Sequence, residues 1–312
     1  MKTKFALIAA LFATISWSQN NFATSEIAVS DLLPGTLYSP NVKSKTNLVI
    51  VIAGSGPTDR NGNQTGMTNN SLKMLSEGIA NSGTAVFSYD KRILAQIKNK
   101  TIDESKLLFS DMIDDAKTVI TFFKNKKKYN KIIIVGHSEG SLISMVAANG
   151  LADGFISLAG AGRPIDDILE EQIVKQMPTI KNELRAKLDE LKSERTFETT
   201  GLPPALAGMF RKSVQPYMIS WIKLNPQTEI AKLQIPVLIV NGDKDLQVQI
   251  TDAQLLHSAQ PKAQFEIIAN MNHIFKSIDG DTAQNMASYN NATMPISAIF
   301  LEKVNSFLKK LK

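Results

Sequence analysis

The sequence predicts an α/β protein built on a doubly wound, mostly parallel sheet with a helical lid insertion. Short β-rich runs alternate with segments of helical periodicity along most of the 312 residues, and this alternation is typical of parallel strands joined by crossover helices. Several of the runs are continuously apolar, as strands are when helices cover both faces of their sheet. A chain of this length, with an ordinary apolar fraction of 43%, is compatible with one large domain that carries an insertion.

Residues 1–18 predict a secretory signal peptide. Lys2 and Lys4 precede an apolar run from Phe5 to Ile15, and small residues follow at Ser16 and Ser18. The run is about half of the ~20 apolar residues that span a bilayer, so a retained membrane anchor is the weaker alternative. We therefore expect an exported protein, periplasmic or secreted after cleavage, with no stable membrane insertion of the mature chain.

The expected α/β core occupies residues 19–162 and 231–312. Residues 19–45, around "LPGTLYSP", predict a β-hairpin or edge strands. The runs that predict central strands are 47–53, 84–90, 131–136, 154–160, 235–241 and 263–269. Helical patterns cover 71–82, 106–128, 139–149, 250–259 and 295–310. Ligands of such sheets sit at the carboxyl ends of the strands, so motifs that directly follow a strand are the candidates for function.

Residues 163–230 break the alternation, because they contain helical patterns and no convincing strand. We expect them to form the helical lid insertion. The charged part, "KNELRAKLDELKSER", indicates a solvated amphipathic helix. The later part is more apolar, and its large side chains either pack between lid and sheet or line an acyl pocket. These side chains are Met209, Phe210, Tyr217, Met218 and Trp221.

The composition excludes several kinds of site. The chain has no cysteine, and therefore no disulfide, thiol nucleophile or thiolate metal site. Its three histidines are His137, His257 and His273, so a histidine-rich metal site is not expected; His257, on a predicted helix, is expected to be structural or exposed. The net charge of +6 identifies no partner. The basic run 124–131 ends a predicted helix, where the helix dipole favours cations, so we expect solvated surface and no nucleic-acid binding.

Ser138 lies between a β-rich run and a helical segment in "KIIIVGHSEGSLISM". Gly136 and Gly140 flank it in a Gly-x-Ser-x-Gly motif, and this strand, turn and helix context is that of a nucleophile elbow. A tight elbow brings the two backbones so close that a Cβ at either glycine would clash. The alternative, that Ser138 only caps the helix, does not explain both glycines. We expect His137 to pack within the elbow.

A serine hydroxyl becomes a nucleophile when a base takes its proton and a carboxylate orients that base. Downstream of Ser138, "GDKD" and "NMNH" each place the needed residue type in a loop after a predicted strand. They supply Asp245, with Asp243 as the alternative, and His273. The order serine, aspartate, histidine is the order of the triad in α/β-hydrolases.

On these residues the chain resembles the α/β-hydrolase superfamily, and within it bacterial secreted carboxylesterases that carry a "GSGPTDRNGN" loop. Here that loop is Gly54–Asn63, and the similarity extends from about "LPGTLYSP" to the C-terminus, weakest in the helical insertion. The resemblance implies that Ser138 is the nucleophile, His273 the general base and acid, and an aspartate of "GDKD" the orienting acid. The family's common spacing, in which two residues separate a glycine from the acid, selects Asp245 over Asp243.

Attack on an ester carbonyl creates an oxyanion, which two backbone N–H groups normally stabilise. One donor is expected from Glu139, the residue after the nucleophile, at a helix N-terminus whose dipole favours an anion. The other is expected from Ser55, with Gly56 as the alternative, in the loop after the first central strand. Many relatives have His-Gly at the start of this loop, whereas this chain has Ala53-Gly54.

The glycine-rich loop also allows other interpretations. A phosphate-cradling loop is one, but the loop contains neither Gly-x-Gly-x-x-Gly nor Gly-x4-Gly-Lys-Ser/Thr, so nucleotide binding is not expected. Asp59, Arg60 and Asn61 either hold the loop rigid through hydrogen bonds or face the substrate. The structural role is the favoured interpretation.

These parts predict a serine hydrolase that cleaves carboxylic esters with short to medium acyl chains through an acyl-enzyme. A small-molecule ester is then its partner, and no metal or organic cofactor is needed. Thioesterases use the same parts. A catalytically silent α/β-hydrolase fold used for binding is a rival of a different class. No feature of the sequence predicts an oligomeric state.

The closest rival enzyme is a serine aminopeptidase, which would need a carboxylate near the cleft to hold the substrate amine. Asp166, Asp167, Glu170 and Glu171 of the insertion could provide it. Their simpler interpretation is an acidic cluster at a helix N-terminus, where the dipole favours negative charge.

Overall fold

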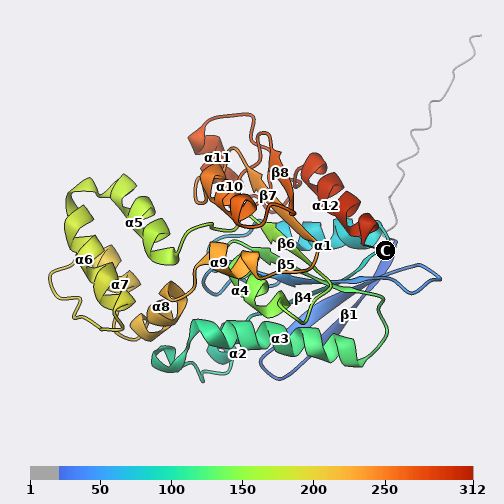
Figure 1. Ribbon diagram of the computed structural model, residues 1–312, viewed down its shortest axis with the longest axis horizontal. Coiled ribbons are helices and arrows are strands. Elements are labelled where there is room, and N and C mark those ends of the chain that lie inside the picture. Colours follow the sequence, from blue (N-terminus) through green and yellow to red (C-terminus); the bar gives the residue numbers. More distant parts are fainter. Residues whose placement is uncertain (1–20, 312) are drawn as a thin grey trace, which may run out of the picture.

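A computed structural model of the chain describes residues 21–311 and contains an eight-stranded sheet (Figure 1). The strand order is β1-β2-β4-β3-β5-β6-β7-β8. The strands are β1 (Phe22–Ala28), β2 (Pro34–Pro40), β3 (Leu48–Ile52), β4 (Ala85–Tyr89), β5 (Ile132–His137), β6 (Gly154–Leu158), β7 (Val237–Gly242) and β8 (Gln264–Ile268). Each run that predicts a central strand overlaps one to within a residue at its end, so the expected α/β fold with a mostly parallel sheet is confirmed. The predicted signal peptide lies outside the described residues.

Helices connect the parallel strands. Outside the segment between β6 and β7 they are α1 (Ser71–Asn81), α2 (Arg92–Lys98), the 3-10 turn η1 (Glu104–Lys106), α3 (Phe109–Asn125), α4 (Glu139–Ala148), α10 (Ile250–Ala259), α11 (Thr282–Ser288) and α12 (Ala298–Lys310). The sequence analysis missed α2 and α11. Both are short, and short helices carry too few turns for a clear 3.6-residue pattern.

The sheet is antiparallel only at its N-terminal edge. The first two strands, β1 and β2, pair antiparallel, with Phe22 opposite Pro40 and Ala28 opposite Pro34, and β2 is antiparallel to β4. The remaining pairs, from β4 and β3 through to β7 and β8, are parallel. The predicted N-terminal hairpin is therefore confirmed.

Two apolar layers cover the two faces of the sheet. Successive side chains of a strand point to opposite faces, and on β3 Ile50 belongs to one layer while Val49 and Val51 belong to the other. The first layer includes side chains of α3, α4 and α10, and the second includes side chains of α1 and α12. Because β3 to β8 run in the same direction, the loops after them meet at one edge of the sheet.

The segment between β6 and β7 forms a helical insertion, and the structure describes no strand in it. Its helices are α5 (Ile165–Gln176), the 3-10 turn η2 (Pro178–Ile180), α6 (Lys181–Lys192), α7 (Pro204–Met209), α8 (Gln215–Ile222) and α9 (Pro226–Ala231). Helices α5 to α8 lie together at one end of the molecule (Figure 1, left). They enclose an apolar cluster of their own that includes Leu188 and Phe210. Helix α6 is amphipathic, with Leu184, Leu188 and Leu191 buried.

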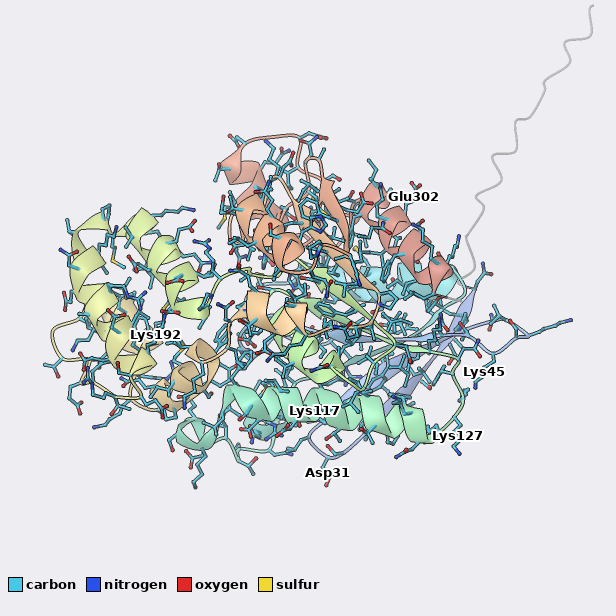
Figure 2. All side chains as sticks on the ribbon, viewed as in Figure 1. Asp31, Lys45, Lys117, Lys127, Lys192 and Glu302 are labelled. Atoms are coloured by element: carbon cyan, nitrogen blue, oxygen red, sulfur yellow. The ribbon has the colours of Figure 1, made fainter. Side chains whose placement is uncertain are left out.

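Charged side chains lie around the outside of the core (Figure 2). The lysines 124 and 126–128 at the end of α3 are exposed, as the sequence analysis expects of solvated surface. Within residues 21–311, the structure contains no helix with the length and apolar character needed to cross a membrane.

Candidate active site

Ser138 occupies a strained turn between β5 and α4. It follows His137, the last residue of β5, and immediately precedes Glu139, the first residue of α4. Its φ of 55° and ψ of −120° are unfavourable for a residue with a side chain, and such strain clusters at functional sites. The Ser138 N–H donates to the carbonyl of Leu158 at 2.9 Å, which ties the turn to β6. Ser138 is half-buried and lines a cavity.

The two glycines of the motif permit this turn. A Cβ on Gly136 would lie 2.1 Å from the carbonyl oxygen of Gly140, and a Cβ on Gly140 would lie 2.6 Å from the carbonyl oxygens of Ala53 and Ile52. Both distances are far below van der Waals contact. The elbow therefore presses α4 against β5 and against the end of β3.

The structure pairs Asp245 with His273. Asp245 follows β7 and His273 follows β8, and Asp245 Oδ2 accepts a hydrogen bond from His273 Nδ1 at 2.8 Å. Asp245 Oδ1 accepts from the backbone N–H groups of Gln247 and Val248 at 2.8 and 2.9 Å, so the carboxylate is fixed on both sides. Asp243, the alternative acid, is exposed. With the proton on Nδ1, Nε2 of His273 is available as a base.

Asn272 holds the loop that carries the base. Its Oδ1 accepts from the N–H groups of Ile274 and Lys276, at 3.2 and 2.9 Å. Its Nδ2 donates to Asn285 Oδ1 at 3.0 Å and to Ser288 Oγ at 2.8 Å. The sequence analysis did not single out Asn272, because its partners on α11 belong to a helix that was missed.

His137 links the elbow to the loop of the base. Its Nε2–H donates to the carbonyl of His273 at 2.9 Å, and the two imidazole rings lie 4.8 Å apart, centre to centre. Burial, together with the neighbouring His273 and Lys91, lowers the pKa of His137 to about 3, so its ring is neutral. The expected packing role is correct, and the structure adds that His137, the residue before Ser138, is bound to the backbone of His273.

Two backbone N–H groups lie at the elbow without a partner. The N–H groups of Glu139 and Ser55 donate no hydrogen bond to any residue in the described part of the chain. Since backbone N–H groups in folded proteins are nearly always paired, these two are free to bind an incoming oxygen. A Cβ on Gly54, which precedes Ser55, would lie 3.3 Å from Ser138 Cβ, so this loop touches the elbow.

The polar residues of the "GSGPTDRNGN" loop are engaged within the fold. Asp59 Oδ1 accepts from the N–H groups of Asn61 and Asn63, both at 2.8 Å. Arg60 donates to Asp90 through Nε at 3.1 Å and through Nη2 at 2.8 Å. These contacts hold the loop rigid, which is the role that the sequence analysis favours.

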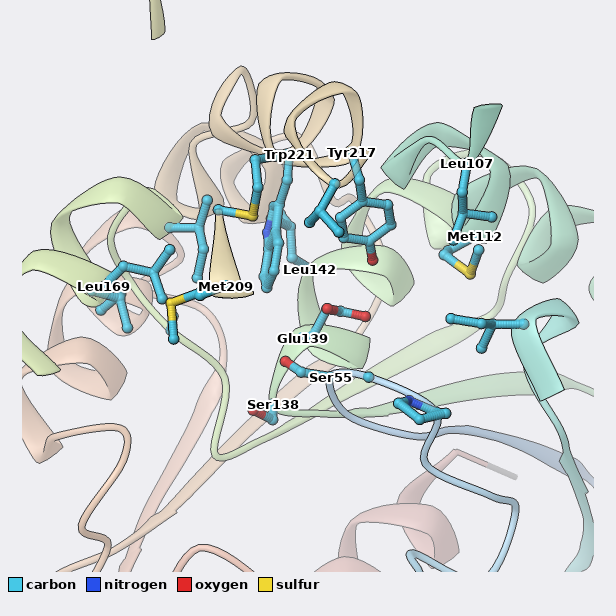
Figure 3. A pocket seen from close by; sticks show the side chains of 18 of the residues that line it. Ser55, Leu107, Met112, Ser138, Glu139, Leu142, Leu169, Met209, Tyr217 and Trp221 are labelled. Atoms are coloured by element: carbon cyan, nitrogen blue, oxygen red, sulfur yellow. The ribbon is translucent and has the colours of Figure 1, made fainter. Parts of the chain in front are cut away.

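An apolar cavity of about 750 Å³ opens above Ser138 (Figure 3). It is bounded by the elbow, α3 and the helical insertion, with lining side chains that include Leu107, Met112, Leu142, Leu169, Met209 and Trp221. Of the apolar residues named for the later part of the insertion, Tyr217 and Met218 also line the cavity, whereas Phe210 is buried in the insertion's own core. Packing inside the insertion therefore applies to Phe210, and lining the cavity applies to the other four residues.

A buried ion pair in the cavity wall was not anticipated. Lys91 Nζ lies 3.3 Å from Glu139 Oε1, and the two side chains are 4% and 2% exposed. Lys91 also donates to the carbonyl of Gly54. Tyr217 lies opposite Glu139 (Figure 3). Burial, together with the negative charge of Glu139, raises the pKa of Tyr217 well above its ordinary value. A lysine in a loop after a strand carries no motif, so no sequence pattern indicates this cluster.

Comparison with known proteins places the chain in a family. The family model BD-FAE matches residues 36–259. The esterase EstD of Thermotoga maritima is 25% identical over 268 residues, which cover 83% of this chain and 62% of EstD. The chain thus spans less than two thirds of that relative's length.

Solved structures show the same fold. Est1E from Butyrivibrio proteoclasticus has a TM-score of 0.56 at 17% identity, over 92% of this chain and 98% of that chain. The Pyrococcus furiosus esterase Pf2001 has a TM-score of 0.55 at 13% identity, over 98% and 99% of the two chains. Because the family model covers more than half of the sequence, the chain belongs to the BD-FAE family, and its fold is that of the α/β-hydrolases.

Proposed function

We propose that the protein is a serine esterase that hydrolyses carboxylic esters with short to medium acyl chains. The observation that carries the proposal is the fixed Asp245–His273 pair at 2.8 Å. The carbonyl of His273 is bound by His137, the residue before Ser138, and an apolar cavity lies above the serine. The relative EstD, which is named as an esterase, supports it.

The proposed reaction proceeds in two acyl-transfer steps. His273 Nε2 takes the proton of the Ser138 hydroxyl while the serine oxygen attacks the acyl carbon. Asp245 keeps the other imidazole proton on Nδ1 and stabilises the imidazolium. The imidazolium then protonates the leaving alcohol, and an acyl group remains on Ser138. Water, deprotonated by His273, releases the carboxylic acid.

We propose that the Glu139 and Ser55 N–H groups bind the oxygen that becomes negative in each step. Their lack of other partners supports this role, and removing one such donor typically lowers kcat ~10²- to 10³-fold. We also propose that the helical insertion serves as a lid over the acyl chain, because Trp221 and Met209 line the cavity.

Ester hydrolysis is tested with p-nitrophenyl acetate, butyrate, octanoate and palmitate, and with methyl ferulate, since ferulic acid is bound in a structure of Est1E. We expect kcat/KM to be highest for butyrate or octanoate. Ser138→Ala is the control for background hydrolysis. A fluorophosphonate should label the wild type and not Ser138→Ala, and absence of both turnover and labelling would contradict the proposal.

The aminopeptidase alternative has less support, because the acids it requires are engaged elsewhere. Asp166 pairs with Arg185 at 2.9 Å and with Lys192 at 3.0 Å. Glu171 pairs with Arg163 at 2.7 Å. Turnover of aminoacyl p-nitroanilides at a higher kcat/KM than any of the esters would reverse this preference.

We further propose that the protein is exported and that a signal peptide is cleaved after Ser18. The basic and apolar pattern of residues 1–18 supports this. N-terminal sequencing of protein recovered from the periplasm or medium of the expressing cells should begin at residue 19. Recovery of the full-length chain from the cytoplasm alone would contradict it.

A further inference from the structure

A buried lysine links the two expected oxyanion donors. Lys91 follows β4, and its side chain reaches the end of the neighbouring strand β3. There its ammonium donates to the carbonyl of Gly54 and lies 3.3 Å from the carboxylate of Glu139. Gly54 precedes one expected donor, Ser55, and Glu139 carries the other. The reaction proposed above assigns Lys91 no role.

The first contact controls where a donor points. The Gly54 carbonyl and the Ser55 N–H belong to one peptide bond, which is planar and trans, so they point in opposite directions. An ammonium that fixes the carbonyl therefore also fixes the N–H. The next carbonyl, that of Ser55, accepts from Thr58 Oγ1 at 2.7 Å and from Gln64 Nε2 at 3.1 Å. The peptide planes on both sides of Ser55 are thus held.

The second contact controls charge at the reacting centre. The Glu139 carboxylate is almost wholly buried, at 2% exposure, and belongs to the residue whose N–H would bind the oxyanion. An unpaired anion there would repel the developing negative charge, and repulsion is strong where water is excluded. Lys91 neutralises the carboxylate, and the Tyr217 hydroxyl faces it from the side of the insertion (Figure 3).

We propose that Lys91 is a positioning residue for the oxyanion hole: it holds the Ser55 N–H toward the reacting carbonyl and neutralises Glu139. The inference rests on the proposed esterase function. A purely structural ion pair behaves differently, since replacing a buried pair by apolar side chains often leaves a protein equally stable and does not selectively weaken binding of a transition state.

The central variant is Lys91→Met, which keeps the apolar stem and removes the ammonium. We expect kcat on p-nitrophenyl butyrate to fall ~10²-fold, as when an oxyanion donor is lost, with KM within about threefold of the wild type. A trifluoromethyl ketone, which adds the Ser138 oxygen to its carbonyl and forms a tetrahedral oxyanion, should lose affinity by a similar factor.

A second variant separates orientation from charge and serves if Lys91→Met does not fold. Lys91→Met/Glu139→Gln leaves no unpaired buried charge but still lacks the contact to Gly54. We expect its kcat to lie above that of Lys91→Met and at least about tenfold below the wild type.

The matched control is Arg92→Met, at the next position. Arg92 donates to Asp115 through Nε and Nη2, both at 2.7 Å, and it does not line the cavity. We expect Arg92→Met to lower Tm and to leave kcat and the affinity for the ketone unchanged.

Three results decide the matter. The inference is overturned if folded Lys91→Met and the double variant keep kcat and ketone affinity within about threefold of the wild type. It is also overturned if the Lys91 and Arg92 variants lose kcat equally, because the effect is then one of general stability. A wild type that shows neither ester hydrolysis nor fluorophosphonate labelling at Ser138 overturns the proposed function and this inference with it.

Discussion

The two sides of Ser138 are built in different ways. On the side of the base, Asp245, His273 and His137 form a chain of hydrogen bonds between side chains and one carbonyl. On the side of the oxyanion, the groups that we propose bind the substrate oxygen are the backbone N–H groups of Ser55 and Glu139, and the side chains beside them, Lys91 and Glu139, are charged and buried.

This difference separates what side-chain type determines from what backbone direction determines. The side of the base functions if the side chains of Ser138, His273 and Asp245 reach one another. Asp245 and His273 each have hydrogen-bond partners that hold them in place. The side of the oxyanion functions only if peptide planes point correctly, which no residue type guarantees. We therefore expect loss of His273 or Asp245 to remove most of the turnover, and substitutions on the second side to reduce it by degrees.

The largest loss is expected from His273→Ala. Without the base, the Ser138 hydroxyl keeps its proton, and kcat should fall ~10⁶-fold, to about the level of Ser138→Ala. The double variant should be no worse than either single one, because the two residues act in the same step. Steady-state hydrolysis of p-nitrophenyl butyrate measures this, with circular dichroism to confirm folding. Losses that multiply in the double variant would show that the two residues act independently.

A smaller loss, ~10⁴-fold in kcat, is expected from Asp245→Asn. The amide can donate to Nδ1 and so favours the imidazole tautomer with its proton on Nε2, which cannot act as a base. Asp243→Asn is the matched control, because Asp243 belongs to the same loop and is exposed; its kcat should stay within about twofold of the wild type. If the two variants exchanged these effects, Asp243 would be the orienting acid.

The same division explains how much could be predicted from the sequence. The strands were predictable because helices cover both faces of the sheet, which leaves continuous apolar runs such as 131–136. Ser138, Asp245 and His273 were predictable as candidates because each follows such a run. The contact between Asp245 and His273 required the fold.

Lys91 and Asn272 could not be found in this way. Lys91 differs from the many exposed lysines of the chain only in where its side chain ends, and that depends on how the loop after β4 lies against β3. Asn272 depends on Asn285 and Ser288 of α11, a helix too short to predict. Sequence patterns report burial and periodicity, whereas these roles depend on the path of loops.

On the side of the base, His137→Gln should lower kcat about tenfold, because the Gln amide can still donate to the carbonyl of His273 but fills less of the space of the ring. It should also change how the free energy of unfolding depends on pH in the acid range. The folded-state pKa of His137 is about 3, below the ordinary 6.5, so the unfolded chain takes up this proton first as the pH falls. The wild type should therefore lose stability between about pH 6.5 and pH 3, by up to about 1.4 kcal/mol per pH unit from this group.

Urea unfolding at pH 7.5, 5.5 and 4.5 measures that slope. In His137→Gln the free energy of unfolding should fall less steeply below about pH 6.5, whereas above this pH the two proteins should show parallel profiles. If the free energy of unfolding fell equally steeply with pH in both proteins, His137 would take up its proton in the folded state as well. The ring that holds His273 would then be charged in the acid range.

The smallest effect is expected on the side of the oxyanion, from Tyr217→Phe. The phenol of Tyr217 faces the Glu139 carboxylate from α8 (Figure 3), so it is one place where the helical insertion meets the elbow. Lys91 still neutralises the carboxylate when the hydroxyl is gone, and kcat should therefore fall only about threefold, with Tm lowered slightly because a polar group beside a buried charge is lost. If Lys91 and Tyr217 share the task of holding Glu139, adding Tyr217→Phe to Lys91→Met should lower kcat by more than threefold again. An effect of the tyrosine that is the same with and without Lys91 would mean that the insertion contributes to the cavity alone, and that the orientation of the oxyanion donors is set within the sheet.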